Sequence, residues 1–113
     1  MPQYIIAHDV GTGGNKAVMV DIEGNVRAMA FAPYPVRYPR PDWAEQEPED
    51  WWGAVTSTTR QVMERSGVAP HDVAAMIHTT QLLGIVPMGA NGQPLRPAII
   101  WLDGRAPEQA ERI

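Results

Sequence analysis

Short apolar runs separated by glycine-containing linkers fill the first third of the chain. β-Branched and other apolar residues dominate positions 4–8, 16–22 and 26–31, and this pattern predicts three strands. The linkers are short, and a turn signal at residues 23–25 follows the second run. Because tight linkers favour consecutive antiparallel strands, the chain is expected to open with two hairpins.

The longest amphipathic stretch follows a proline-rich segment and predicts a helix that begins at Pro48 and stops at Gly67. A proline in the first turn loses no hydrogen bond, and the acidic residues around it suit the positive end of the helix dipole. Apolar residues recur at helical spacing, at Trp51, Trp52, Val55, Val62 and Met63. We expect at least one of the two adjacent tryptophans to pack in a core.

The second half of the chain alternates apolar runs with turn signals. It predicts strands over residues 73–78, 82–88 and 98–101, with an Asn-Gly turn between the last two. Residues 106–113 have a proline at a helix start and good helix formers, but no stop signal follows them. We therefore expect the 113 residues to be a piece of a longer protein.

Composition narrows the class of protein. With 44% hydrophobic and 19% charged residues, the chain resembles one globular domain or less, and no run approaches the ~20 apolar residues of a membrane span. The start lacks the basic and apolar regions of a signal peptide, so we expect a cytoplasmic protein. A net charge of −4 argues against a nucleic-acid partner, and zero cysteines exclude disulfides and thiolate metal sites. Arg37 and Arg40 lie among prolines, Tyr34 and Tyr38, which is typical of an exposed loop.

A glycine-rich segment between the first two predicted strands reads HDVGTGGNK, residues 8–16. It is not a P-loop, because that motif needs a lysine followed by Ser or Thr, and Lys16 is followed by Ala17. It is not a dinucleotide-binding fingerprint, because Lys16 occupies the third glycine position and a strand follows instead of a helix. A glycine-rich hairpin between two strands remains.

This hairpin carries groups suited to a phosphate, although a glycine-rich turn is also common without any ligand. Few side chains obstruct the backbone N–H groups of Gly11, Thr12, Gly13 and Gly14. Thr12 adds a hydroxyl, Lys16 a positive charge, and Asp9 a hard oxygen suited to Mg²⁺, usually through its waters. The glycines alone leave both interpretations open.

Three ordered blocks between residues 4 and 105 carry a resemblance to a known family. The first block, Asp9-x-Gly11-Thr12 with Lys16 following and an Asp21…Gly24 turn after the second strand, resembles the first phosphate motif of the actin-like ATPases and sugar kinases. The second block, WAEQEPEDWW at residues 43–52, resembles the W-x-E-Q-x-P-x-x-W-W segment of the FGGY carbohydrate kinases. The third block, GQPLRPAIIWLDGR at residues 92–105, is similar to another segment of that family.

The resemblance implies an α/β fold of the actin-like, ribonuclease H-like kind, with a mixed sheet that opens with antiparallel hairpins. It implies ATP-dependent phosphorylation of a small sugar or polyol, with Mg²⁺, by two domains that close over a cleft. Residues 1–113 would be the N-terminal part of the first domain. The catalytic base, an aspartate in that family, would lie downstream, so this piece alone is expected to be inactive. The expected partner is the sugar or polyol, with a homodimer left open.

The resemblance also assigns roles to individual residues. On the ATP side, Asp9 would act on the Mg²⁺, Lys16 would steady the phosphates, and the phosphate contacts would come from Gly11, Thr12, Gly13 and Gly14. On the sugar side, the substrate would be bound by Gln81, Leu82, Leu83, Trp101, Asp103 and Arg105. Asp103 and Arg105 are equally expected to form a salt bridge that holds their loop.

The sugar loop departs from the patterns of two members of this family. Xylulokinases carry Gln-Met-His-Gly where this chain has Gln-Leu-Leu-Gly at residues 81–84, so a hydroxyl contact is lost or supplied elsewhere. Glycerol kinases carry an Arg-Glu pair that is also absent here. The resemblance therefore favours a xylulose-like ketose narrowly, ahead of gluconate or another polyol. A non-catalytic actin-like binding or regulatory module is the alternative function.

Several conspicuous side chains have structural interpretations. Trp43 is expected to anchor a packed loop. No carboxylate stands at metal-ligand spacing from the histidines, so structural or solvated positions are expected for His8, His71 and His78. Scattered methionines are typical of core filling, and this applies to Met19, Met29, Met63, Met76 and Met88.

Overall fold

The computed structural model describes Met1 and residues 3–113 and divides into two compact units. The first unit comprises Met1–Tyr34 and Glu49–Gln81, and the second comprises Pro35–Pro48 and Leu82–Ile113. The chain therefore passes from the first unit to the second and back before it ends in the second.

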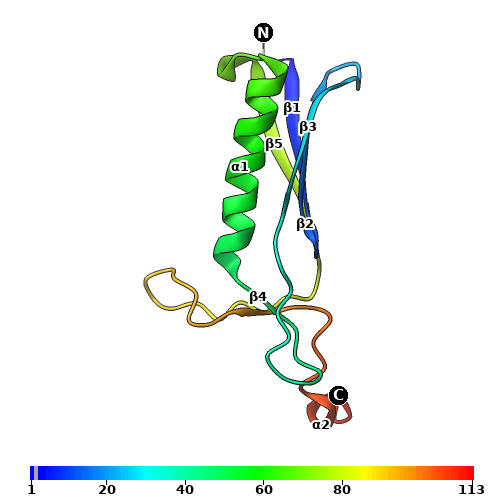
Figure 1. Ribbon diagram of the computed structural model, residues 1–113, viewed down its shortest axis with the longest axis vertical. Helices are drawn as coiled ribbons and strands as arrows, with labels where there is room; N and C mark the ends of the chain where they lie inside the picture. The colour runs from blue at the N-terminus through cyan, green and yellow to red at the C-terminus, as the bar shows by residue number, and fades with distance from the viewer. Residues whose placement is uncertain (2) are drawn as a thin grey trace. The chain divides into compact units, whose positions relative to one another are not determined.

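The first unit is built on a four-stranded mixed sheet with the order β3-β2-β1-β5 (Figure 1). Its strands are β1 (Tyr4–Val10), β2 (Gly14–Asp21), β3 (Val26–Pro33) and β5 (Val73–Thr80). β1, β2 and β3 are antiparallel neighbours, and β5 pairs with β1 in parallel. The two opening hairpins and the mixed sheet predicted from the sequence are confirmed.

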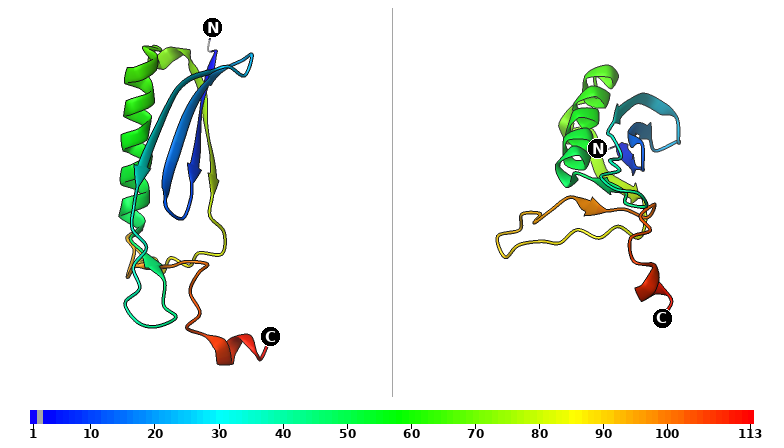
Figure 2. Two further views of the ribbon diagram at one scale, coloured as in Figure 1. Left: turned by 45° about the vertical axis from the view of Figure 1, so that its right-hand side comes forward. Right: turned by 60° about the horizontal axis from the view of Figure 1, so that its bottom comes forward.

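Helix α1 (Pro48–Ser66) covers one face of this sheet, and the left view in Figure 2 shows the helix lying along it. Buried residues alternate along β1, at Ile6, His8 and Val10, because successive side chains of a strand point to opposite faces. The buried residues of α1 are Ala54, Val55, Thr58 and Val62. The other face of the sheet carries exposed side chains.

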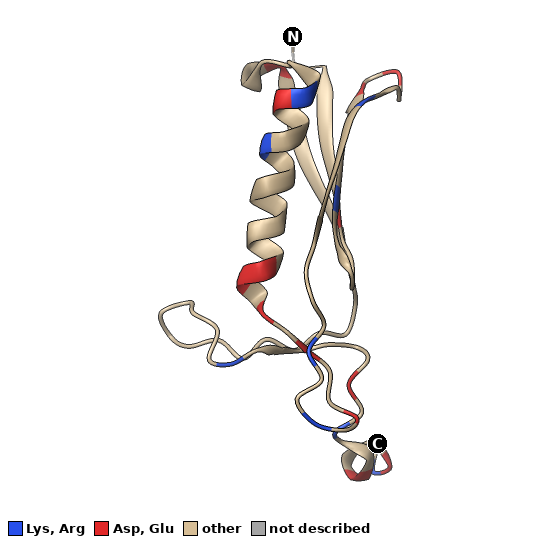
Figure 3. Ribbon diagram, viewed as in Figure 1, with Lys and Arg blue, Asp and Glu red and all other residues tan. Residues whose placement is uncertain are grey.

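The charged residues near the two ends of α1 have the signs that the helix dipole favours. Glu49 and Asp50 lie in its first turn and Arg65 lies in its last turn, and Figure 3 shows the acidic residues at the start of the helix. Both placements suit the helix dipole. Gly67, which the sequence marked as the stop, has a φ of 66°, a left-handed conformation that glycine adopts without a steric penalty.

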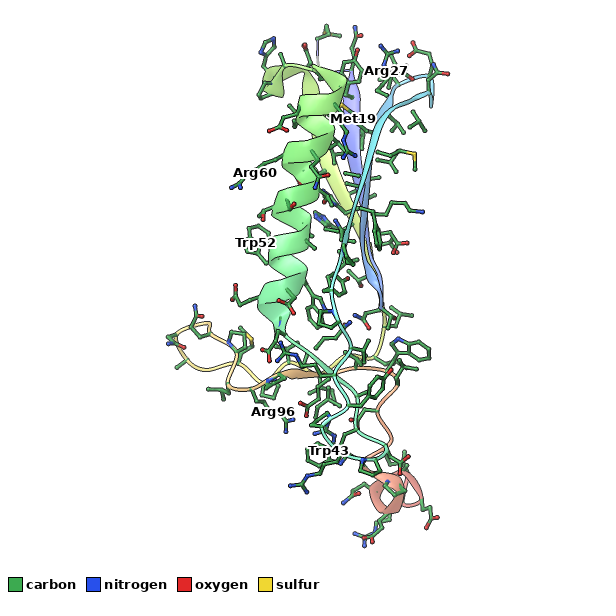
Figure 4. The ribbon with its side chains drawn as sticks, viewed as in Figure 1. Met19, Arg27, Trp43, Trp52, Arg60 and Arg96 are labelled. Carbon is green, nitrogen blue, oxygen red and sulfur yellow. The ribbon has the colours of Figure 1, made fainter. Side chains whose placement is uncertain are left out.

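The core of the first unit consists of two clusters. One contains Ile6, Ala17, Met19, Ala28, Ala30 and Val62, and the other contains Val10, Tyr34, Ala54 and Val55. Trp51 packs against the second cluster, whereas Trp52 is 65% exposed on α1 (Figure 4). One of the two adjacent tryptophans therefore packs, as predicted.

The second unit is organised by a small antiparallel ladder. Strand β4 (Glu45–Gln46) pairs with β6 (Ala98–Ile99). Single bridges extend the ladder on both sides, from Arg37 to Glu45 and from Ile85 to Ile99. Short helical segments are η1 (Pro70–Asp72) in the first unit and α2 (Pro107–Ala110) in the second.

Of three predicted elements in the second unit, one is absent and two are shorter than the sequence indicated. Residues 82–88 form no strand and contribute only isolated bridges, because Leu83 has a left-handed φ of 61° and Pro87 has no N–H to donate. The strand predicted over 98–101 ends at Ile99, because a turn follows at residues 101–102, and the helix predicted over 106–113 spans only Pro107–Ala110.

Two interpretations of individual side chains were wrong. Met29, Met76 and Met88 are about half exposed, at 50%, 46% and 51%, so only Met19 and the partly buried Met63 fill the core. Tyr34 is buried at 6% exposure, although the proline-rich segment around it predicted an exposed loop. Arg37 and Arg40 are exposed as predicted.

No helix in the described part of the chain has the length and apolarity to cross a membrane.

Candidate functional site

The glycine-rich segment forms the hairpin between β1 and β2, as its sequence predicted. Val10 pairs with Asn15, and the N–H of Gly11 donates to the Gly14 carbonyl at 3.0 Å, which closes a four-residue loop. Asp9 and Lys16 stand opposite each other in the ladder, and both are exposed on the face of the sheet that α1 does not cover. A carboxylate and an ammonium therefore flank the base of this loop, which we call the phosphate hairpin (residues 9–16).

The glycines of the phosphate hairpin differ in how strictly the surrounding structure requires a residue without a side chain. A Cβ at Gly14 would lie 2.5 Å from Cζ of Phe31 and 2.6 Å from the Ala32 carbonyl oxygen, so packing against β3 requires glycine there. A Cβ at Gly11 would reach the Gly14 carbonyl at 3.4 Å, and at Gly13 it would meet nothing within 4 Å. Gly13 alone thus leaves open space above the backbone, as a ligand would need.

A buried polar group joins the strands of the hairpin to α1. Nδ1 of His8 accepts a hydrogen bond from the side-chain amide of Asn15 at 2.9 Å. Its Nε2 therefore carries the proton and donates to the Thr59 hydroxyl at 3.2 Å, whose own proton goes to the Val55 carbonyl. Burial and the stacked ring of His78, 4.9 Å away, lower the pKa of His8. His8 is structural, in agreement with the sequence.

The carbonyl group of Gly11 accepts two side-chain hydrogen bonds. The Tyr34 hydroxyl donates to it at 2.5 Å and Nε2 of Gln81 donates at 3.3 Å. Tyr34 was not among the residues predicted for a site. The signal was present, because Ala28, Ala30 and Tyr34 continue one period-two pattern of inward positions along and beyond β3.

A pocket of about 670 Å³ lies within the second unit. Four of the six residues predicted to bind the substrate line it, namely Leu83, Trp101, Asp103 and Arg105. Leu82 is 73% exposed and is not among the lining residues. Gln81 belongs to the first unit, where it contacts the phosphate hairpin. The structure thus brings together most of the predicted sugar-binding residues and gives Gln81 a different contact.

A network of ion pairs supports the pocket. The carboxylate of Glu45, buried on β4, accepts hydrogen bonds from Arg96 and, at 2.9 Å, from Arg105. Arg105 also binds Asp103, with Nη2 at 2.6 Å and Nε at 2.8 Å. The salt bridge that the sequence offered as one role of Asp103 and Arg105 is therefore present.

The same network fixes the chain around Trp43 and Asp103. Oδ2 of Asp103 accepts the N–H of Ala44 at 2.8 Å, and Arg105 holds the pKa of this carboxyl well below its usual range. The guanidinium of Arg105 lies 3.8 Å from the ring centre of Trp43, and that of Arg40 lies 4.8 Å from it, both at cation–π distances. Trp43 is thus a packed anchor, as predicted, and Figure 4 shows its position.

The donor set of the phosphate hairpin fits a nucleotide phosphate with its cation. In the described part of the chain no three His, Cys, Asp or Glu side chains gather into a metal site. A Mg²⁺ at Asp9 would therefore take its other ligands from phosphate oxygens and water, as this ion does when it is bound with a nucleotide. Backbone N–H groups and Lys16 would complement the phosphate charge.

The fold defines the class of protein first. An antiparallel β1-β2-β3 meander, a parallel β5 beside β1 and a glycine-rich β1–β2 hairpin form the N-terminal portion of an actin-like ATPase domain. The comparisons agree: residues 4–113 match the family model described as "FGGY family of carbohydrate kinases, N-terminal domain". The chain belongs to the FGGY family of carbohydrate kinases.

Relatives that are named after different substrates resemble the chain to similar degrees. A glycerol kinase of Thermococcus gammatolerans is 33% identical over 113 residues, which are 100% of this chain and 23% of that protein. A xylulose kinase of Rhodospirillum rubrum superposes with a TM-score of 0.88 at 29% identity, covering 97% of this chain and 23% of the other. A gluconate kinase of Lactobacillus acidophilus gives 0.88 at 27%, covering 96% and 22%. The chain thus spans less than a quarter of each relative.

Proposed function

We propose that the protein carrying this chain transfers the terminal phosphoryl group of ATP to a hydroxyl of a small sugar or polyol, and that this chain supplies part of the site. The observation that carries the proposal is the phosphate hairpin, in which Asp9 and Lys16 face each other across β1 and β2 beside a backbone loop. Membership of the FGGY family supports the same reaction.

On the ATP side, the groups of the phosphate hairpin would bind the phosphates of ATP and orient them. Mg·ATP supplies the phosphoryl group and a divalent charge that offsets its negative oxygens. Asp9 would hold the cation, directly or through its waters, and Lys16 would balance charge on the phosphates. Thr12 and Gly13 would present backbone N–H groups to the phosphates, whereas the Gly11 N–H, which the sequence also assigned to them, already donates to the Gly14 carbonyl at 3.0 Å. Because phosphoryl transfer depends mainly on positioning and charge, these contacts are a sufficient contribution from this chain.

On the sugar side, the pocket of the second unit combines apolar surface with a buried donor. Trp101 is 52% exposed and offers an apolar face for a sugar ring. Nη1 of Arg105 is buried and has no hydrogen-bond partner among the described residues. A buried donor without a partner is costly, but Nη1 is closed off from solvent, so in this proposal the Arg105 side chain shifts when the sugar binds and Nη1 then donates to a substrate hydroxyl.

A xylulose-like ketose is the substrate that we favour, with gluconate or another polyol as the alternative. Leu83 stands at the position where xylulokinases have histidine, and its apolar side chain is 85% exposed at the pocket. The loop therefore has no imidazole for a hydroxyl, and the Arg105 guanidinium is the donor that replaces it in this proposal.

The test is a phosphorylation screen of the full-length protein with xylulose, glycerol and gluconate as acceptors, in which ADP release is the signal measured. We expect xylulose to have the highest kcat/KM. A profile dominated by gluconate or glycerol would overturn the order of substrates but not the reaction. No ADP release with any sugar or polyol would instead favour a binding or regulatory module.

Trp101→Ala is expected to weaken sugar binding more than catalysis. Loss of one aromatic face costs about 1–3 kcal/mol, so the KM for the sugar should rise about 5- to 160-fold, while the KM for ATP stays unchanged. Steady-state kinetics with each substrate varied in turn measures both constants. Trp52→Ala, at an exposed position on α1, is the matched control and should change neither. Equal changes in the two KM values of Trp101→Ala would contradict a sugar contact.

A further inference from the structure

The two strands that flank the phosphate hairpin each end in a residue that holds it. Tyr34 follows β3, and its N–H donates to the Gly13 carbonyl at 3.3 Å. Gln81 follows β5, and its N–H donates to the Val10 carbonyl at 2.9 Å. β3 pairs with β2 and β5 pairs with β1, so the hairpin is held by the neighbouring strand on each side of it within the sheet.

The side chains of these two residues meet at one atom. The Tyr34 hydroxyl and the Gln81 amide both donate to the Gly11 carbonyl oxygen, at 2.5 and 3.3 Å. A carbonyl oxygen has two lone pairs, and this one uses both with side chains that lie 23 and 70 residues away in the chain. The direction of the Gly11 carbonyl is therefore set by tertiary structure.

That direction also sets the next N–H group. In a trans peptide the C=O of one residue and the N–H of the next point in opposite directions, and the described chain contains no cis peptide. Holding the Gly11 carbonyl toward Tyr34 thus aims the Thr12 N–H the other way. Glycine on its own allows this peptide plane many orientations, so the constraint has to come from a partner.

The partner is itself rigid. The Tyr34 ring is packed with Val10, Ala54 and Val55, and the residue is only 6% exposed, which fixes where its hydroxyl lies. Burial and the negative charge of Asp9 raise the pKa of Tyr34 to about 12, so the phenol keeps its proton and acts as a donor at neutral pH.

We infer that Tyr34, together with Gln81, is a positioning residue that holds the Gly11–Thr12 peptide in the orientation that binds the phosphates of a nucleotide. This inference rests on the proposed function, because it assigns the nucleotide to the same hairpin. A loop that is already held in its binding orientation loses less conformational entropy when the phosphates bind. The nucleotide therefore binds more tightly. Tyr34 itself contacts no substrate.

The test is Tyr34→Phe in the full-length protein, which keeps the ring in its cluster and removes one donor. We expect the Kd for Mg·ATP from titration calorimetry and the KM for ATP to rise about fivefold, the factor for a loss of roughly 1 kcal/mol with one hydrogen bond. The KM for the sugar should not change, whereas the Tm should fall slightly because one buried hydrogen bond is lost. Tyr38→Phe, at a residue 66% exposed, is the matched control.

Two results would overturn the inference. A lower Tm with both KM values unchanged would make Tyr34 a residue of structure alone, and a rise in the KM for sugar equal to that for ATP would show no selective effect on the hairpin. The proposed function fails separately, if the wild-type protein phosphorylates no sugar. In that case the Kd for Mg·ATP still tests Tyr34, and a wild-type protein that binds no nucleotide would refute both.

Gln81 supplies an independent arm of the same test, because the family resemblance assigned it to the sugar. Gln81→Met should raise the KM for ATP if the amide acts through the Gly11 carbonyl, and the KM for sugar if it binds substrate. Because Tyr34 and Gln81 share one acceptor, the double variant should deviate from the sum of the two single variants. An additive double variant would show that the two side chains act separately.

Discussion

Replacing Asp9 by asparagine should lower kcat on the order of 100-fold, because the amide keeps the shape of the carboxylate and removes the charge that, in the proposed function, would hold the cation near the reacting phosphate. The KM for the sugar should stay within about twofold of the wild-type value, since the proposed function gives the phosphate hairpin no contact with the sugar. Asp9 is exposed at the end of β1, so the variant is expected to fold normally. A coupled assay of ADP release, with sugar and ATP varied separately, measures these constants.

Glu64→Gln is the charge-matched control for that experiment. Glu64 is exposed on α1, so the variant also loses one negative charge but should retain the wild-type kcat. If Asp9→Asn lowers kcat no more than Glu64→Gln does, Asp9 has no part in phosphoryl transfer. If it raises the KM for the sugar as strongly as it lowers kcat, the division between an ATP side and a sugar side is wrong.

Replacing Glu45 by alanine should cost about 3 kcal/mol of folding free energy, the lower end of what removal of one partner from a buried ion pair costs. Glu45 is 7% exposed and its carboxylate binds both Arg96 and Arg105. Arg105, whose side chain is 14% exposed, would keep only Asp103 as a counter-ion. We take the lower end because the Arg96 side chain is 39% exposed and water would replace part of its interaction. Urea unfolding followed by circular dichroism measures the loss.

Glu47→Ala, two residues further along, is the matched control for Glu45→Ala. Glu47 also binds an arginine, Arg37, at 3.1 Å, but the two side chains are 34% and 58% exposed. Solvent screens such a pair, so its loss should cost about 0–1 kcal/mol. Equal costs for the two variants would mean that burial of Glu45 adds nothing to the stability of the second unit.

Local sequence patterns predicted the elements of the first unit because each has a local cause. The apolar runs and tight linkers gave β1, β2 and β3, and Pro48 and Gly67 bounded the helix that α1 forms. The second unit was predicted less well, because its pieces are held by partners distant in the chain. Residues 82–88 have the composition of a strand, yet their pairing is limited to single bridges, including Ile85 with Ile99.

The candidate site divides in the same way. The phosphate hairpin could be found from Asp9, the glycines and Lys16, since all lie within eight positions and the strand after them excluded two commoner phosphate motifs. Gln81 was assigned to the sugar by its place in a motif, whereas the structure gives it a contact with Gly11. A motif fixes the position of a residue along the chain but not the atom that its side chain contacts.

The sequence by itself determined the mixed α/β fold, the hairpin and the family, because strand periodicity, glycine turns and short motifs are written in neighbouring residues. Only the tertiary structure decided that Tyr34 is buried against the hairpin, that Glu45 joins two arginines, and that the close approach of β3, at Phe31 and at the Ala32 carbonyl oxygen, requires Gly14. These contacts join residues 17 to 60 positions apart. They depend on how the strands and loops pack, and no local pattern of residues encodes that packing.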